Sequence, residues 1–139
     1  MPSERILVVD DDPAILSLLE VLLRRERYQV DTASGGRDAL SKIELTRYDV
    51  IVLDLMMPEV SGFEVLKRLH VRDPQIKCVV VVSAGSEFEV VHAITPNVFT
   101  SLRKPFDIQA LVTAVQKCIE AGCEPAVPPA QLPPVVTAA

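Results

Sequence analysis

The stretch that decides the fold is residues 6–13, ILVVDDDP, in which four apolar residues run directly into three consecutive aspartates. The apolar part is rich in β-branched side chains and has the length of a strand that is buried on both faces, as in a parallel sheet. Carboxylates this close repel one another, which costs free energy unless a cation offsets their charge. We therefore expect a buried parallel strand that ends at a cation site.

Strand-like and helix-like patterns alternate along the rest of the chain. Continuous apolar runs predict two further buried strands, and weaker runs predict two more. The four ranges are residues 50–53, 78–82, 29–33 and 98–102. Apolar residues at helical spacing predict helices between these strands and after the last one. The apolar positions of these helices lie within residues 15–22, 39–43, 63–69 and 108–119, with a further helix expected over about 87–94.

Five alternating strand and helix units predict an α/β fold. We expect a doubly wound, five-stranded parallel sheet of flavodoxin-like order 2-1-3-4-5. The chain of 139 residues is 49% hydrophobic, which suits one domain with a real core. That domain is expected over residues 1–121. The proline- and alanine-rich residues 122–139 are expected to be a disordered tail or linker.

Composition argues against several classes of function. A net charge of -5 gives no general attraction to nucleic acid or to an anionic membrane surface. The chain has no apolar run long enough to span a bilayer, and its first residues lack the apolar segment of a signal peptide. Three cysteines without CxxC spacing suit a reducing compartment. We expect a cytoplasmic domain that binds neither nucleic acid nor membrane directly.

Chemically useful residues follow four of the predicted strands. In a doubly wound sheet the ligand lies outside the carboxyl ends of the strands, at the switch point between the first and third. The residues that follow these strands are Asp10, Asp11 and Asp12, then Asp54, Ser83, and Lys104 with Pro105. All of them are therefore expected at one edge of the sheet.

The segments VVDDD, VLDLMMP, VVSAG and RKPF, in this order and at these strand ends, resemble the receiver domain of bacterial two-component response regulators. The resemblance covers about residues 4–121. It implies that Asp54 accepts a phosphoryl group from a phosphohistidine on a sensor histidine kinase or phosphotransfer protein. It also implies that Ser83 and Lys104 contact the phosphoryl oxygens, and that the Lys104–Pro105 peptide bond is cis.

The resemblance further implies a Mg²⁺ site. Asp11 would bind the ion directly, Asp10 would hold it through water, and Asp54 and the Met56 carbonyl would complete the protein ligands. The charges agree, because three aspartates and Lys104 sum to minus two and a divalent cation brings the sum to zero. Mg²⁺ typically takes one or two carboxylates together with waters and phosphate oxygens. The expected protein is a signalling phosphoacceptor rather than an enzyme, and it acts on a downstream protein or output domain.

Two other functions are compatible with parts of the pattern. A haloacid-dehalogenase-like phosphohydrolase would use Asp10 as nucleophile and Asp12 as acid or base, although Pro13 and Ala14 do not match that family's motif. A degenerate receiver would act only as a docking module, although the acidic, hydroxyl and lysine set is complete. The simplest interpretation of Asp12 is structural, as the N-cap of a helix that begins at Pro13. Ser61 is expected to cap a later helix.

The sequence departs from the receiver pattern at two places, at Ser101 and at residues 95–99, which replace the usual small, glycine-containing turn before the fifth strand. Receivers often carry an aromatic residue three positions before the lysine, and here that position is Ser101. We expect Phe99 to be the aromatic residue that repacks on phosphorylation, together with the helix near residues 87–94.

Overall fold

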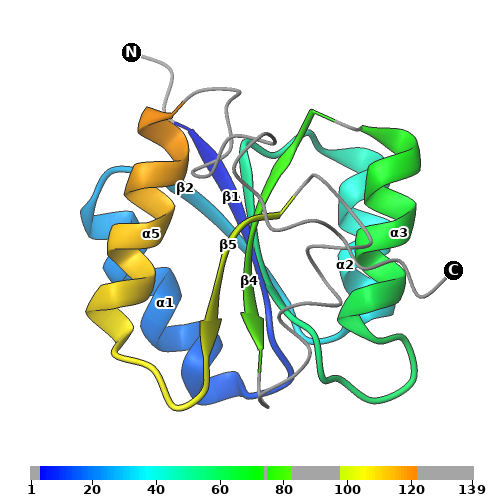
Figure 1. The fold of residues 1–139 in the computed structure, drawn as a ribbon, viewed down its shortest axis with the longest axis horizontal. Coiled ribbons are helices and arrows are strands. Elements are labelled where there is room, and N and C mark those ends of the chain that lie inside the picture. Colours follow the sequence, from blue (N-terminus) through cyan, green and yellow to red (C-terminus); the bar gives the residue numbers. More distant parts are fainter. Residues whose placement is uncertain (1–3, 74, 83–97, 122–139) are drawn as a thin grey trace, which may run out of the picture.

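The computed structural model describes residues 4–73, 75–82 and 98–121. Five parallel strands form one sheet in the order β2-β1-β3-β4-β5, which confirms the predicted topology (Figure 1). The strands are β1 (Arg5–Val9), β2 (Gln29–Ala33), β3 (Val50–Asp54), β4 (Lys77–Val82) and β5 (Val98–Arg103).

Helices cover both faces of this sheet. The described helices are α1 (Pro13–Arg25), α2 (Gly36–Leu45), α3 (Gly62–Arg72) and α5 (Ile108–Glu120). Figure 1 shows α1 and α5 on one face and α2 and α3 on the other. Within the described residues, no helix combines the length and apolar character that crossing a membrane requires. Three predicted features lie outside the described residues. They are the helix near residues 87–94, the site residue Ser83, and the tail or linker at residues 122–139.

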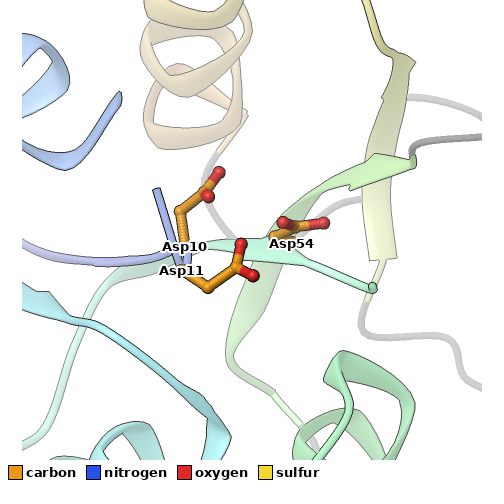
Figure 2. A group of neighbouring side chains, drawn as sticks. All are labelled: Asp10, Asp11 and Asp54. Carbon is orange, nitrogen blue, oxygen red and sulfur yellow. The ribbon is translucent and has the colours of Figure 1, made fainter. Parts of the chain in front are cut away.

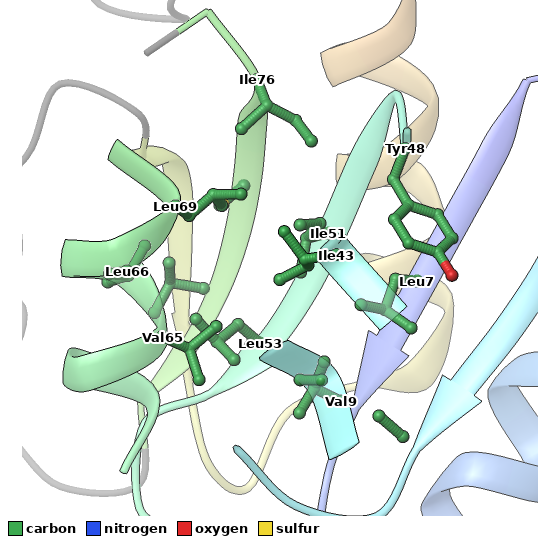
Figure 3. Packing of buried hydrophobic residues seen from close by; sticks show 14 of the residues in the cluster. Leu7, Val9, Ile43, Tyr48, Ile51, Leu53, Val65, Leu66, Leu69 and Ile76 are labelled. Atoms are coloured by element: carbon green, nitrogen blue, oxygen red, sulfur yellow. The ribbon is translucent and has the colours of Figure 1, made fainter. Parts of the chain in front are cut away.

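The core consists of two layers, one on each face of the sheet. Successive residues of a strand point to opposite faces, so Leu7 and Val9 pack toward α2 and α3, whereas Ile6 and Val8 pack toward α1 and α5. Figure 3 shows the first layer, in which side chains of α3 face those of β3, and Leu7 and Val9 of β1 belong to the same cluster. Burial on both faces explains why these strands are continuous apolar runs rather than alternating ones.

Both predicted helix caps are confirmed. The Asp12 carboxylate accepts a hydrogen bond from the Ala14 N–H at 2.9 Å, and Pro13 occupies the first turn of α1. The Ser61 hydroxyl accepts one from the Glu64 N–H at 3.4 Å at the start of α3. A capping oxygen satisfies a backbone N–H that has no partner within the helix. The Asp12 side chain therefore serves as the N-cap of α1.

Strand β5 carries one extra residue opposite β4. Cys78 pairs with Val98, but Val79 pairs with Thr100, so Phe99 has no partner in the register. Phe99 is buried in the layer of α1 and α5. Ser101 pairs with Val80, which belongs to the opposite layer, and paired residues share a face of the sheet. The repacking expected of Phe99 stays a prediction, and the structure places this ring on the opposite face from Ser101.

Candidate functional site

Three aspartates meet at the carboxyl edge of the sheet. Asp10 and Asp11 follow β1, and Asp54 is the last residue of β3, the neighbouring strand. One carboxylate oxygen from each lies within 4.8 Å of the others (Figure 2). Asp10 and Asp54 are only 4% and 2% exposed, whereas Asp11 is exposed. The predicted acidic cluster is therefore present, with two members buried and one open to solvent.

Backbone N–H groups orient the two buried carboxylates. Asp10 Oδ1 accepts a hydrogen bond from the Asp12 N–H at 2.9 Å. Asp54 Oδ1 accepts one from the Met56 N–H at 3.1 Å. In both residues the donor lies two positions further along the chain, a local arrangement that aspartate favours at turns. Each carboxylate is thus fixed through one oxygen, and its Oδ2 is directed to another partner.

Lys104 is that partner for both carboxylates. Its Nζ lies 3.1 Å from Asp54 Oδ2 and 3.5 Å from Asp10 Oδ2, and its side chain is 28% exposed. The lysine directly follows β5, which is separated from β3 by β4, so it reaches across the end of a strand. The Lys104–Pro105 peptide bond is cis, as the sequence resemblance implied. Residues from three strands thus form one site.

Burial and charge act together on the titration of these groups. Burial raises the pKa of Asp10, and the negative charge of Asp54 adds to this, while the Asp12 N–H and Lys104 partly oppose it. Burial alone would lower the pKa of Lys104, but its hydrogen bond to Asp54 and the charges of both aspartates raise it above its ordinary value. Lys104 therefore stays charged at neutral pH, and it offsets only one of three neighbouring negative charges.

Two glycines, to which the sequence analysis assigned no role, hold the loop that follows Asp54. A Cβ added to Gly62 would lie 2.3 Å from the Asp54 carbonyl oxygen, and the Gly62 N–H donates to the Leu55 carbonyl oxygen at 3.0 Å. A Cβ added to Gly36 would lie 2.3 Å from the Val60 carbonyl oxygen. The sequence marks both positions by placing glycine, a weak helix former, at the first residue of a helix.

The roles of two other predicted site residues stay predictions. Met56 lies beside the aspartates. Its N–H donates a hydrogen bond to Asp54 Oδ1, and the residue is 52% exposed to solvent. The role of its carbonyl as a metal ligand stays a prediction. Ser83 lies outside the described residues, so its contact with a phosphoryl group also stays a prediction.

A family model for the response regulator receiver domain matches residues 6–116. The chain belongs to this family. The match contains every described residue of the site, and the observed sheet order is the one that the receiver resemblance implied.

Curated relatives of this receiver domain fall into two kinds. Sporulation initiation phosphotransferase F of Bacillus subtilis (strain 168) is 34% identical over 117 residues, which cover 84% of this chain and 94% of the relative. The alkaline phosphatase synthesis transcriptional regulatory protein PhoP of the same organism is 36% identical over 116 residues, which cover 81% of this chain. The receiver chain spans 48% of that regulator's length, and 44% of the length of the Mycobacterium tuberculosis regulator TrcR.

Solved structures show the same fold. A CheY-like response regulator receiver domain protein from Methanospirillum hungatei JF-1 superposes with a TM-score of 0.80 at 27% identity, covering 87% of this chain and 97% of that one. Response regulator protein TrrA from Thermotoga maritima, solved in complex with Mg(2+)-BeF, gives a TM-score of 0.74 at 32% identity. That match covers 83% of this receiver chain and 98% of TrrA.

Proposed function

We propose that this receiver domain accepts a phosphoryl group on Asp54 from a phosphohistidine of a sensor histidine kinase or phosphotransfer protein. The observation that carries the proposal is the position of Asp54, a buried carboxylate that contacts Lys104 at 3.1 Å beside two further aspartates. The modified domain then presents an altered surface to a downstream protein or output domain. Its role is that of a signalling phosphoacceptor.

The chemistry follows from the arrangement of the chain's own groups. An Asp54 carboxylate oxygen forms a bond to phosphorus while the bond from phosphorus to the donor imidazole nitrogen breaks, and the nitrogen keeps that electron pair. An ionised carboxylate needs no general base. Lys104 stabilises the negative charge on the transferring oxygens, and the Met56 N–H keeps the carboxylate oriented. Ser83 is the proposed second contact to the phosphoryl oxygens.

The donor set fits Mg²⁺. Three carboxylates with oxygens within 4.8 Å of one another, one of them solvent-exposed, suit a small cation that keeps several waters. Asp11 and Asp54 would bind the ion directly together with the Met56 carbonyl. Asp10 would act through water, as the receiver resemblance implies. When bound, the ion offsets the negative charge that gathers around the phosphoryl group. TrrA, a relative by fold and sequence, was solved with Mg(2+)-BeF.

Domain organisation and location belong to the same proposal. Residues 1–121 form the receiver domain, and residues 122–139 form the tail or linker that follows it. The domain acts in the cytoplasm, where sensor kinases expose their phosphohistidines. In support, curated relatives include both a phosphotransferase of nearly the same length and transcriptional regulators about twice as long.

Acetyl phosphate with Mg²⁺ tests the proposal directly. We expect one acyl phosphate per chain, trapped with borohydride and located at Asp54 by mass spectrometry. Asp54→Asn should abolish labelling. The matched control is Asp12→Asn, which removes a charge from the same edge but keeps a helix-capping oxygen, and it should label as the wild type does.

The same measurement separates the alternatives. A label at Asp10 would indicate a hydrolase that uses the first strand, and would overturn the assignment. Absence of any label in the wild type, under conditions in which a known receiver is labelled, would indicate a docking module. Asp11→Asn should raise the Mg²⁺ concentration needed for half-maximal labelling, because it removes one directly ligating charge.

A further inference from the structure

A groove lies at the edge of the sheet opposite to the aspartates. Two adjacent pockets of about 360 and 330 Å³ share four lining residues, which are Arg47, Tyr48, Asp73 and Ile76. The first pocket is bounded by the ends of α2 and α3, and the second by the last turn of α5 and the starts of β1 and β4. We call this pair of pockets the amino-edge groove. It runs from one helical layer to the other.

The walls of the amino-edge groove combine apolar and charged side chains. Its floor is formed by the buried side chains of Ile43, Tyr48, Leu69 and Ile76. Leu45, on its rim, is 87% exposed and offers an apolar side chain to a ligand. The groove is also lined by charges of both signs, among them Arg47 and Lys77 beside Glu44 and Asp73, and Arg47 lies 3.8 Å from Asp73.

The described part of the chain ends beside this groove. Cys118 and Ile119, in the last turn of α5, line its second pocket, and the described chain stops two residues later at Ala121. The 18 residues that follow read GCEPAVPPAQLPPVVTAA, with Glu124 as their single charge. We propose that residues 122–139 bind the amino-edge groove of the same molecule as an extended segment. This inference does not depend on phosphoryl transfer.

Length and composition support this occupant. Crossing from one helical layer over the sheet to the other spans roughly 20 Å, about two helix diameters. An extended proline-rich segment covers about 3 Å per residue, so about seven of the 18 residues are enough to cross. Proline pairs at 128–129 and 133–134 restrict the backbone, which lowers the entropy that binding costs. Because the segment is tethered beside the groove, its effective concentration is on the order of millimolar and weak contacts suffice.

A spin label in the part of the segment that would cross the groove tests the proposal. Ala126→Cys is introduced together with Cys123→Ser, and the buried thiols of Cys78 and Cys118 remain unlabelled. We expect the label to broaden the amide signals of Arg47, Asp73 and Lys77 selectively. Leu45→Asp should reduce this broadening at least twofold. The matched control is Val71→Asp, since Val71 is equally exposed at 85% and lies outside the groove.

Three results would overturn the proposal. The first is broadening that is absent or spread evenly over the surface. The second is an equal effect of Leu45→Asp and Val71→Asp. The third comes from mixing a spin-labelled chain with an isotope-labelled chain that carries no spin label. Selective broadening in that mixture would show that the groove takes the segment of a second copy rather than its own.

Discussion

Lys104 is shared by two buried carboxylates, and this makes its removal informative. Lys104→Met leaves Asp10 and Asp54 without their described cation, in side chains only 6% and 2% exposed. An unpaired buried charge is costly, so we expect the free energy of unfolding to fall by about 2 kcal/mol without Mg²⁺. Urea denaturation measures this change. Added Mg²⁺ should restore part of the loss, since it supplies the missing positive charge.

The control for that variant is Lys67→Met, which removes an exposed lysine from α3. Its effect should stay within about 0.5 kcal/mol, and Mg²⁺ should not alter it. If both variants lose the same stability, the contact of Lys104 with the aspartates has no net value.

Gly62 is a second residue whose substitution should have a defined result. In Gly62→Ala the new methyl group would meet the Asp54 carbonyl oxygen and the Leu55 Cα, which lie 2.3 and 2.6 Å from an ideal Cβ. Both are backbone atoms, so the loop must shift. We expect a loss of about 2 kcal/mol in unfolding free energy and, under the proposed function, slower labelling of Asp54. Gly35→Ser is the control, because a Cβ there meets nothing within 4 Å, and it should be neutral or slightly stabilising.

At the scale of residues, the sequence predicted which side chains carry the chemistry better than it predicted which residues hold them in place. The Asp12 cap followed from its position before Pro13, and local rules of this kind need no knowledge of tertiary structure. The contact of Lys104 with Asp54 spans 50 residues. Their positions at strand ends predicted one shared edge of the sheet, and the receiver resemblance implied that both act on one phosphoryl group. The role of Gly62 could not be predicted, since it depends on how closely α3 approaches the end of β3.

At the scale of elements, one hydrogen bond connects β2 to Tyr48, two residues before the start of β3. The Tyr48 hydroxyl donates to Asp31 Oδ2 at 2.7 Å. Burial, together with this bond to a carboxylate, raises the pKa of Tyr48 to about 12. An unfolded tyrosine ionises near pH 10, so between about pH 10 and 12 the unfolded state loses a proton that the folded state keeps. This contribution to stability is complete below pH 10 and disappears as the pH rises through 12.

Tyr48→Phe tests that linkage. Below pH 10 the variant should lose about 1 kcal/mol, the usual value of one hydrogen bond. Between pH 10 and 12 the free energy of unfolding of the wild type should fall more steeply than that of the variant. Urea denaturation at a series of pH values gives both slopes, and absorbance at 295 nm follows the ionisation itself. Parallel slopes would contradict the role assigned to Tyr48.

Sequence patterns predicted which elements form, but not how β5 pairs. The apolar run at 98–102 indicated a strand, yet a run of residues carries no information on which partner each one faces. The extra residue in β5 changes the alternation of faces after Val98, so Phe99 and Ser101 lie in different layers. Pairing of this kind is decided by the packing of both layers against β4.

At the scale of the whole molecule, two buried cysteines report on the two layers separately. Cys78 lies in the layer of α2 and α3, and Cys118 in the layer of α1 and α5. Burial raises the pKa of the Cys118 thiol to about 12, and burial together with nearby Cys118 raises that of Cys78 further. At pH 8 only about one Cys118 thiol in ten thousand is then ionised, and the thiolate is the reactive form.

We therefore expect neither thiol to react with an alkylating reagent in the native protein at pH 8. In increasing urea, both should become reactive over the same range of concentrations, because the shared sheet makes the layers unfold together. Peptide mapping by mass spectrometry gives the two rates. Reaction of Cys118 well before Cys78 would mean that the layer of α1 and α5 opens independently.

The sheet order was predictable at this scale because alternating strand and helix units allow few topologies. Five such units at these lengths point to a doubly wound sheet, and its carboxyl edge is where ligands bind. The amino-edge groove was not predictable, since its walls come from the ends of three helices that are far apart in sequence.

The aspartates and the lysine that contacts them come from the ends of three different strands, and Lys104 lies 94 residues from Asp10 along the chain. No chain that has lost β1, β3 or β5 can therefore hold these groups together. Damaged or partly folded copies would fail to signal rather than signal incorrectly. The distance between these residues along the chain thus acts as a form of quality control, because a complete site forms only in chains whose strands β1, β3, β4 and β5 have assembled.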